Sequence, residues 1–286
     1  MPKTPTERSI VTLIREGTLD TELAASLWLL IEARVPVIVA AEAGQVGKST
    51  LLDALLAFLP PNATVVRLKG ETETFDWLPQ ASELGWPGVA SPPSKGSPIR
   101  PDDTVLYAAE LSDHLPIYTW GKAAQVAIRA ASIGYGLAAT IHADSLDDVF
   151  EALRRWPVRL SDDELSHLGV VLVVRRLEDD RRRVVAGHFV RPLARDEHGH
   201  TQRLGPAVLA TWDPDADEFE HFAWGVTPEL ARRVGMRAGD FEVEVHRRRE
   251  HLDGLVATDV TELQRTLAAL RAYTAAAPFD APRKDA

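Results

Sequence analysis

The segment Glu42–Ser49 (Glu-Ala-Gly-Gln-Val-Gly-Lys-Ser) constrains the fold of this chain more than any other. It lies between a nearly uninterrupted apolar run at Val35–Ala41 and a helical pattern at Ser49–Leu59, which Pro60 and Pro61 end. An apolar run of this length is typical of a strand buried on both faces of a parallel sheet. A strand, a glycine-containing turn that closes on Gly-Lys-Ser and a helix together predict a phosphate-binding turn.

In such a turn the backbone N–H groups and the helix N-terminus hold phosphates, and the lysine reaches the β- and γ-phosphates. We therefore expect Lys48 to be exposed in the turn and Ser49 to ligate Mg²⁺. The residues predicted to bind the nucleotide are Gly44, Gln45, Val46, Gly47, Lys48, Ser49 and Thr50. Glu42 departs from the pattern, because it replaces a glycine and would repel phosphates unless it points into solvent. The alternative is a structural strand–turn–helix junction with an incidental lysine.

Further apolar runs alternate with helical patterns along the first part of the chain. Alternation of this kind favours a parallel α/β sheet. Thr21–Arg34 has a helical pattern with Asp20 as its N-cap. The additional strands are predicted at Thr64–Leu68, Thr104–Ala109, Leu137–Ile141 and Val170–Val174.

Two polar side chains follow predicted strands directly. Glu110 follows Thr104–Ala109, and His142 follows Leu137–Ile141. A P-loop ATPase needs an acidic residue at the end of a neighbouring strand to hold Mg²⁺ or polarise water, and Glu110 could supply it. His142 could donate a hydrogen bond to a γ-phosphate. The alternatives are that Glu110 only closes a strand and that His142 is structural.

Composition changes along the chain. Trp86–Pro101 contains five prolines and predicts an exposed, mobile loop. After Val174 the chain is more charged, and Arg175–Arg183 is interpreted as a solvated hairpin. We expect a linker-like segment at 1–20, a nucleotide-binding core at 21–174 and a smaller α+β extension at 175–286. The extension has predicted strands at Val184–Val190, Val208–Trp212 and Glu218–Phe222, with a turn at Asp213–Asp217. Helices are predicted in Thr227–Tyr273, where the arginines Arg247–Arg249 indicate a salt-bridged surface.

Composition also excludes several classes of protein. The chain has no cysteine, which excludes disulfides, thiol catalysis and cysteine-ligated metals. Lys and Arg number 32 against 42 Asp and Glu, a net charge of −10 that argues against a nucleic-acid partner. Met1–Arg8 has no apolar signal-peptide core, and the apolar runs are far shorter than the ~20 residues that span a bilayer. We expect a cytoplasmic protein that reaches the inner face of a membrane only through a partner.

The order of these motifs resembles the C-terminal motor domain of the type II/type IV secretion ATPase superfamily, above all its archaeal branch of archaellum and type IV pilus assembly motors. The matching segments, spread over roughly Leu13–Tyr273, are Gly17–Glu32, Phe58–Pro61, Arg100–Asp102, Ala109–Glu110, Gly134–Ser145 and Thr211–Phe219. The resemblance implies a RecA-like P-loop NTPase core, ATP and Mg²⁺ as cofactors, and Ser49 and Glu110 at the metal. It also implies that His142 senses the γ-phosphate and that Arg100 bridges subunits.

The resemblance further implies a hexameric ring, either a homo-oligomer or a hetero-ring with related ATPases, acting on a membrane platform protein. The chain departs from the family at several places. Lys69-Gly70 stands where the family has an adjacent Glu-Asp pair, and Glu71 or Glu73 could replace it only with a shift. Of two arginines before Glu110 only Arg100 is present. Because the match begins at the segment that links the family's two domains, we expect no counterpart of its separate N-terminal domain. Two functions therefore stay open: an active motor ATPase of a pilus or secretion machine, or a nucleotide-binding, hydrolysis-impaired subunit in a ring of complete motors.

Overall fold

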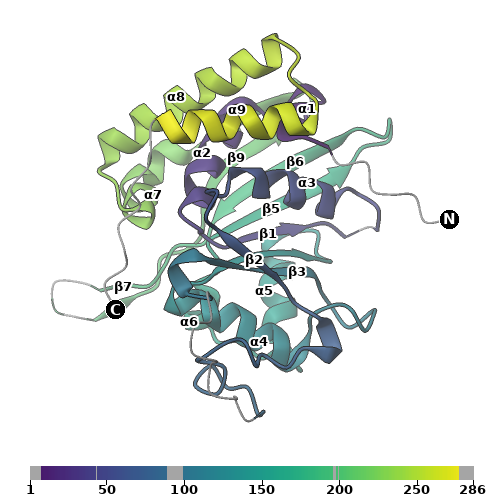
Figure 1. Ribbon diagram of the computed structural model, residues 1–286, viewed down its shortest axis with the longest axis vertical. Helices are drawn as coiled ribbons and strands as arrows, with labels where there is room; N and C mark the ends of the chain where they lie inside the picture. The colour runs from purple at the N-terminus through teal and green to yellow at the C-terminus, as the bar shows by residue number, and fades with distance from the viewer. Residues whose placement is uncertain (1–7, 43, 89–98, 196–197, 199, 277–286) are drawn as a thin grey trace.

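The computed structural model describes residues 8–42, 44–88, 99–195, 198 and 200–276. Its centre is an eight-stranded mixed sheet with helices on both faces (Figure 1). In chain order its strands are β1 (Val37–Ala40), β2 (Thr64–Arg67), β3 (Thr104–Leu111), β4 (Gly136–Ile141), β5 (Val170–Arg176), β6 (Arg182–Phe189), β9 (Ala207–Asp213) and β10 (Glu218–His221).

The sheet has a parallel half and an antiparallel half. Across the sheet the order is β10-β9-β6-β5-β1-β4-β3-β2. All neighbouring pairs from β5 to β2 are parallel, whereas β6, β9 and β10 continue the sheet in antiparallel pairs. A separate two-stranded sheet pairs β7 (Ala194–Arg195) with β8 (Thr201–Gln202). The predicted mixed α/β class with a largely parallel sheet is therefore confirmed.

The helices divide between the two faces of the sheet. Helices α1, α2, α3, α7, α8 and α9 cover one face, and α4, α5 and α6 cover the other (Figure 1). Their bounds are α1 (Ile10–Arg15), α2 (Thr21–Glu32), α3 (Lys48–Leu55), α4 (Gly121–Ala130), α5 (Leu146–Arg154), α6 (Asp162–Leu165), α7 (Thr227–Val234), α8 (Ala238–Ala257) and α9 (Leu263–Ala276).

The central position of β1 explains its uninterrupted apolar sequence. Val37 and Val39 belong to the core on one face, and Ile38 and Ala40 belong to the core on the other. Successive side chains of a strand point to opposite faces, so a strand covered on both sides needs apolar residues at every position.

The predicted elements fall close to the observed ones. The predicted helix at Thr21–Arg34 ends at Glu32, and Asp20 caps it by accepting a hydrogen bond from the Leu23 N–H. The helix predicted at Ser49–Leu59 is α3 followed by a short 3-10 turn at Leu56–Phe58.

The strands predicted on both sides of Val174 form one sheet. Val174 lies within β5. Strand β6 pairs with β5, and β9 pairs with β6. Hydrogen bonds between neighbouring strands thus join the predicted segments 21–174 and 175–286 within one sheet. Their division into separate domains stays a prediction.

One predicted surface is partly wrong. Arg248 on α8 is fully buried and pairs with Glu32 on α2, whereas the neighbouring Arg247 and Arg249 are largely exposed. Successive residues of a helix point in different directions, so only one arginine of the run faces α2.

Two other expectations concern exposure and membranes. Most of the predicted loop at Trp86–Pro101 lies outside the described residues, because these omit 89–98. Among the described helices, none combines the length and the apolar character that crossing a bilayer requires.

Candidate functional site

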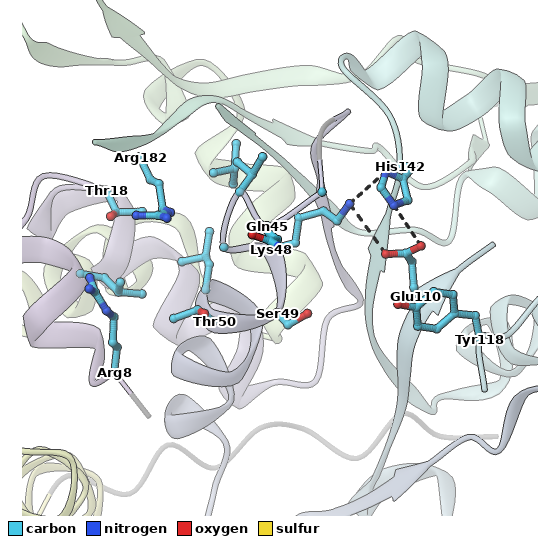
Figure 2. Close-up of a pocket in the computed structure, with 16 residues that line it drawn as sticks. Arg8, Thr18, Gln45, Lys48, Ser49, Thr50, Glu110, Tyr118, His142 and Arg182 are labelled. Carbon is cyan, nitrogen blue, oxygen red and sulfur yellow. Dashed lines mark hydrogen bonds and ion pairs between the residues drawn. The ribbon is translucent and has the colours of Figure 1, made fainter. Parts of the chain in front are cut away.

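Three neighbouring parallel strands bring the predicted site residues together. The turn that contains Lys48 follows β1, Glu110 lies near the end of β3, and His142 follows β4. The carboxyl ends of parallel strands meet at one edge of a sheet, which is where ligands of open α/β sheets commonly bind. All three side chains line one cavity of about 550 Å³, together with Gly44 to Leu51 (Figure 2).

The backbone of the turn is left-handed at Gln45 and Gly47 and leads into a helix N-terminus without a side-chain cap. Gly47 has a φ of 96° and precedes α3 as its N-cap, where it offers no side-chain cap to the first turn. Uncapped N–H groups at a helix N-terminus favour an anion. Gln45 has a φ of 61°, a left-handed conformation that is uncommon for a residue with a side chain. Val46 is buried and anchors the turn to the core.

Lys48 is buried, and the expectation that it is exposed in the turn is wrong. Its side chain is 7% exposed, and its Nζ donates a hydrogen bond to the Ala41 carbonyl oxygen at 3.1 Å. The same Nζ lies 3.8 Å from Oε2 of Glu110. The ammonium folds back over the sheet edge because these two oxygens offer it partners there. Burial lowers the pKa of Lys48, and the negative charge of Glu110 opposes that shift.

Glu110 connects the lysine to a histidine. Its buried carboxylate accepts a hydrogen bond from the Ser112 hydroxyl at 2.9 Å through Oε1. The same Oε1 lies 3.1 Å from Nε2 of His142, so the two carboxylate oxygens face different partners. The pairing of β3 with β4 shifts register between Ala108 and Leu111, an irregularity that commonly re-aims a side chain.

His142 is half-buried and spans the cavity edge between two segments. Its Nδ1 lies 2.9 Å from the backbone carbonyl oxygen of Glu42, at the start of the turn, and 3.3 Å from Nζ of Lys48. Glu42 itself is exposed, and its backbone is the part of the residue that contacts His142.

Ser49 and Thr50 line the same cavity from the first turn of α3. Ser49 is exposed, so its hydroxyl is open to a ligand. With Glu110, it gives the cavity the two oxygen ligands predicted for Mg²⁺, a cation that prefers oxygen.

The structure does not bring Arg100 into this cavity. Arg100 precedes β3, is exposed, and pairs with Asp103 at 2.6 Å. Glu110 lies at the other end of β3, and a rise of about 3.3 Å per residue puts the two roughly 20 Å apart. Within one chain Arg100 therefore does not contact a ligand held by the turn.

The two acidic residues considered as replacements for the family's Glu-Asp pair also lie elsewhere. Glu73 is buried and accepts hydrogen bonds from the Lys69 and Phe75 N–H groups and from Nε1 of Trp77. These contacts use its carboxylate to hold a chain turn together. Glu71 lines a different cavity, with Ser112 and Tyr118. Among the described residues that line the Lys48 cavity, Glu110 is the one carboxylate.

The sequence did not identify two further residues at the site. His114, in the loop after β3, places Nδ1 3.9 Å from Oε1 of Glu110. Arg182 lines the cavity from β6, and its side chain approaches Gly47 so closely that a Cβ added to Gly47 would lie 3.1 Å from Cδ of Arg182. The spacing of His114 four residues after Glu110 was the one available signal for His114.

The predicted β5–β6 hairpin is confirmed, but it is not solvated throughout, because Arg183 is buried.

Comparisons with known proteins give relatives without an assigned activity. No family model matches the chain. The chain is 26% identical over 260 residues to the uncharacterized protein MJ1287 of Methanocaldococcus jannaschii, covering 86% of this chain and 91% of that protein. It is 24% identical over 264 residues to the uncharacterized protein MJ0900 of the same organism, covering 88% of this chain and 46% of that protein.

Two solved structures of the ATPase DotB are similar at a low level. The Legionella pneumophila structure has a TM-score of 0.33 and 17% identity, over 54% of this chain and 46% of that one. The Yersinia pseudotuberculosis structure has a TM-score of 0.35 and 14% identity, over 91% of this chain and 62% of that one. This chain thus spans about half to three fifths of the DotB chains. Likenesses this low assign neither fold nor activity, so we interpret the site from its own geometry.

Proposed function

We propose that this chain binds ATP with Mg²⁺ at the turn Gly44–Thr50, as a RecA-like P-loop subunit of a pilus- or secretion-type machine. The observation that carries the proposal is the convergence of the turn, Glu110 and His142 from three adjacent parallel strands on one cavity. A helix N-terminus without a side-chain cap and a lysine in the same cavity favour a polyphosphate over a neutral ligand.

Each residue has a distinct task in this proposal. Lys48 exchanges its contacts with Ala41 and Glu110 for phosphate oxygens, while the N–H groups of the turn hold the β-phosphate. Ser49 and Glu110 would hold Mg²⁺, which neutralises phosphate charge when bound. His142 lies beside Lys48 and can donate a hydrogen bond to the terminal phosphate.

Hydrolysis is the open part of the proposal. The arrangement of Lys48, Glu110 and His142 favours an active ATPase in which Glu110 orients water. The positions of Glu73 and Arg100 favour the second candidate, a subunit that binds ATP but hydrolyses it poorly. In both cases Arg100 could act only on a nucleotide held by a neighbouring subunit, which fits a ring. The hexameric ring, the related ATPases in it and the membrane platform partner rest on the motif resemblance alone.

The test is a calorimetric titration of the full chain with ATP and Mg²⁺. We expect Lys48→Ala to weaken binding by about 1.5–3 kcal/mol, since it removes one charge-assisted phosphate contact. Lys69→Ala is the matched control, because Lys69 is exposed and lies outside the cavity. No ATP binding by the parent protein, or equal binding by parent and Lys48→Ala, would overturn the proposal.

Phosphate release measured on the same samples separates the two candidates. Turnover that Glu110→Gln abolishes while ATP binding persists selects the active motor. Binding without turnover, also at concentrations where the protein self-associates, selects the hydrolysis-impaired subunit.

A further inference from the structure

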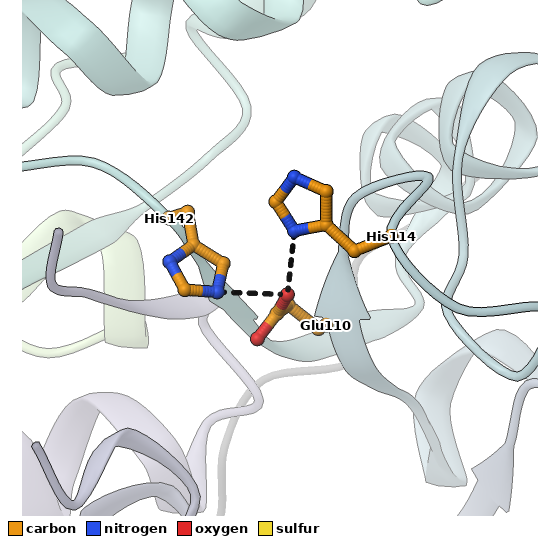
Figure 3. Close-up of side chains that lie close together, drawn as sticks. All are labelled: Glu110, His114 and His142. Atoms are coloured by element: carbon orange, nitrogen blue, oxygen red, sulfur yellow. Dashed lines mark ion pairs between the residues drawn. The ribbon is translucent and has the colours of Figure 1, made fainter. Parts of the chain in front are cut away.

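Three side chains at the edge of the cavity form a second constellation. Glu110, His114 and His142 each place one ligand atom so that all three atoms lie within 4.8 Å of one another (Figure 3). We propose that they bind a divalent transition-metal ion such as Zn²⁺, through Oε1 of Glu110, Nδ1 of His114 and Nε2 of His142. The inference stands on this geometry and needs no bound nucleotide, although both sites share Glu110.

The distances suit a first-row transition metal. Zn–N and Zn–O bonds of about 2.0–2.2 Å in a tetrahedral site put neighbouring ligand atoms roughly 3.4 Å apart. The separation of Nε2 of His142 from Oε1 of Glu110 is 3.1 Å, and that of Nδ1 of His114 from the same oxygen is 3.9 Å. The side chain of His114 is 62% exposed on a loop, so it can close the remaining gap without disturbing the core.

The second ring nitrogen of His142 has contacts that fit a metal-binding histidine in one of its two tautomers. Nδ1 lies 2.9 Å from the carbonyl oxygen of Glu42. A carbonyl oxygen only accepts hydrogen bonds, so in the tautomer that carries its proton on Nδ1 this nitrogen donates to Glu42, whereas in the other tautomer it accepts from Nζ of Lys48 at 3.3 Å. In the first tautomer the lone pair of Nε2 faces a carboxylate oxygen at 3.1 Å, an arrangement that a cation between the two atoms would stabilise. Histidines that bind metals commonly donate their other N–H to a backbone carbonyl in this way.

The ligand set also indicates which cation fits. Two imidazoles and one carboxylate suit zinc, cobalt, nickel or iron(II), whereas Mg²⁺ and Ca²⁺ prefer oxygen ligands throughout. Three protein ligands leave coordination positions for water or substrate. Because Glu110 and His142 line the cavity, such a position would face the phosphate-binding turn.

The position of Lys48 gives the proposal a distinctive consequence. Its ammonium lies 3.8 Å from Oε2 of Glu110, so it repels a metal held by Oε1. Removing this charge should raise metal affinity by about tenfold or more, since unit charges a few ångströms apart interact appreciably even near a protein surface. Lys48→Ala should therefore strengthen metal binding while it weakens ATP binding.

The experiment titrates the full chain, first freed of metal by a chelator, with Co²⁺ by visible absorption and with Zn²⁺ by calorimetry. We expect one equivalent bound with ligand-field bands, and a loss of at least about tenfold in affinity in His114→Ala, which removes one of three ligands. His246→Ala is the matched control, since His246 is exposed on α8 and away from the cluster. The double variant His198→Ala/His200→Ala controls for adventitious binding at a second histidine pair.

Two results would overturn the proposal. One is saturable binding that His114→Ala leaves unchanged but the His198/His200 double variant removes. The other is the absence of saturable binding, which would make the His142–Glu110 contact a hydrogen bond that Nε2 of His142 donates to the carboxylate. Titration of His114→Ala with ATP in excess Mg²⁺ keeps the two proposals apart. Loss of Zn²⁺ binding with normal ATP binding supports the metal site, whereas failure of ATP binding in the parent bears on the proposed function alone.

Discussion

Arg248 and Lys48 are both buried cations that lie beside carboxylates, and their surroundings differ. Arg248 on α8 is fully enclosed, pairs with Glu32 and Glu244, and lies 4.8 Å from the centre of the Trp28 ring. Lys48 is nearly as buried but lines a cavity, and its distance to the Glu110 carboxylate is 3.8 Å, longer than a hydrogen bond. Burial alone therefore does not distinguish a structural charge from one available to a ligand.

The difference lies in what each cation would lose by moving. Arg248 is held by two carboxylates and an aromatic ring, and it does not line the cavity that contains Lys48. Lys48 has one hydrogen bond to a carbonyl and one long ion pair, both of which phosphate oxygens could replace. Arg248 thus fixes α8 against α2, whereas Lys48 can change partners without unpacking a helix.

The largest effect is expected from breaking the enclosed pair. Arg248→Met leaves the Glu32 carboxylate, which is 4% exposed, without its partner. Removing one member of a buried ion pair typically costs about 3–5 kcal/mol of unfolding free energy. Urea denaturation followed by circular dichroism would measure the loss.

The neighbouring arginine provides the control for this prediction. Arg249 is 47% exposed and pairs with Glu22, so Arg249→Met should cost less than about 1 kcal/mol. Equal stability of the two variants would contradict the assignment of Arg248 as the structural charge.

A smaller effect is expected from the pH dependence of the difference in stability between the parent protein and Arg248→Met. Burial raises the pKa of Glu32, and the charge and hydrogen bond of Arg248 oppose that rise. Without Arg248 the pKa should rise further. A carboxyl group whose folded pKa exceeds its unfolded value adds stability below the unfolded pKa, and that stability is lost as pH rises through the folded pKa. The difference in unfolding free energy between parent and Arg248→Met should therefore narrow as the pH falls from 7 to 5, because protonation of Glu32 stabilises the variant more than the parent.

Denaturation of both proteins at the two pH values measures this narrowing. Glu32→Gln in the Arg248→Met background is the matched variant, since it removes the titrating group. The double variant has no Glu32 carboxyl to protonate, so the narrowing of the gap on acidification should disappear. A gap that widens on acidification would show that another group dominates.

The sequence predicted the parts of the site that follow strands directly. Glu110 and His142 each follow an apolar run directly, and Lys48 begins the helix after the turn that follows another run. Parallel strands bring such positions to one edge of the sheet. The burial of Lys48 could not be predicted, because the oxygens that hold it belong to Ala41 and to a strand far along the chain.

Other features depend on tertiary contacts that leave no local pattern. His114 reaches Glu110 because the loop after β3 turns back, and Arg182 reaches Gly47 because β6 pairs with β5. Arg248 lies between Arg247 and Arg249 on the same helix, so the sequence alone does not distinguish the three arginines. Only the direction of α8 relative to α2 selects which of the three is buried.

The smallest effect on stability is expected at the other cation. Lys48→Met removes a charge whose pKa is lowered by burial, so folding no longer has to place that charge away from water. Glu110 loses an ion pair of 3.8 Å but keeps its hydrogen bond from Ser112 and its contact with His142. These changes oppose each other, and we expect the unfolding free energy to change by about 1 kcal/mol or less, which does not exceed the usual effect of a point substitution. The same urea denaturation, run beside Arg248→Met, tests the comparison directly: a loss of about 3 kcal/mol or more would make Lys48 a structural charge like Arg248. A small change together with weakened ATP binding would place the two buried cations in different roles.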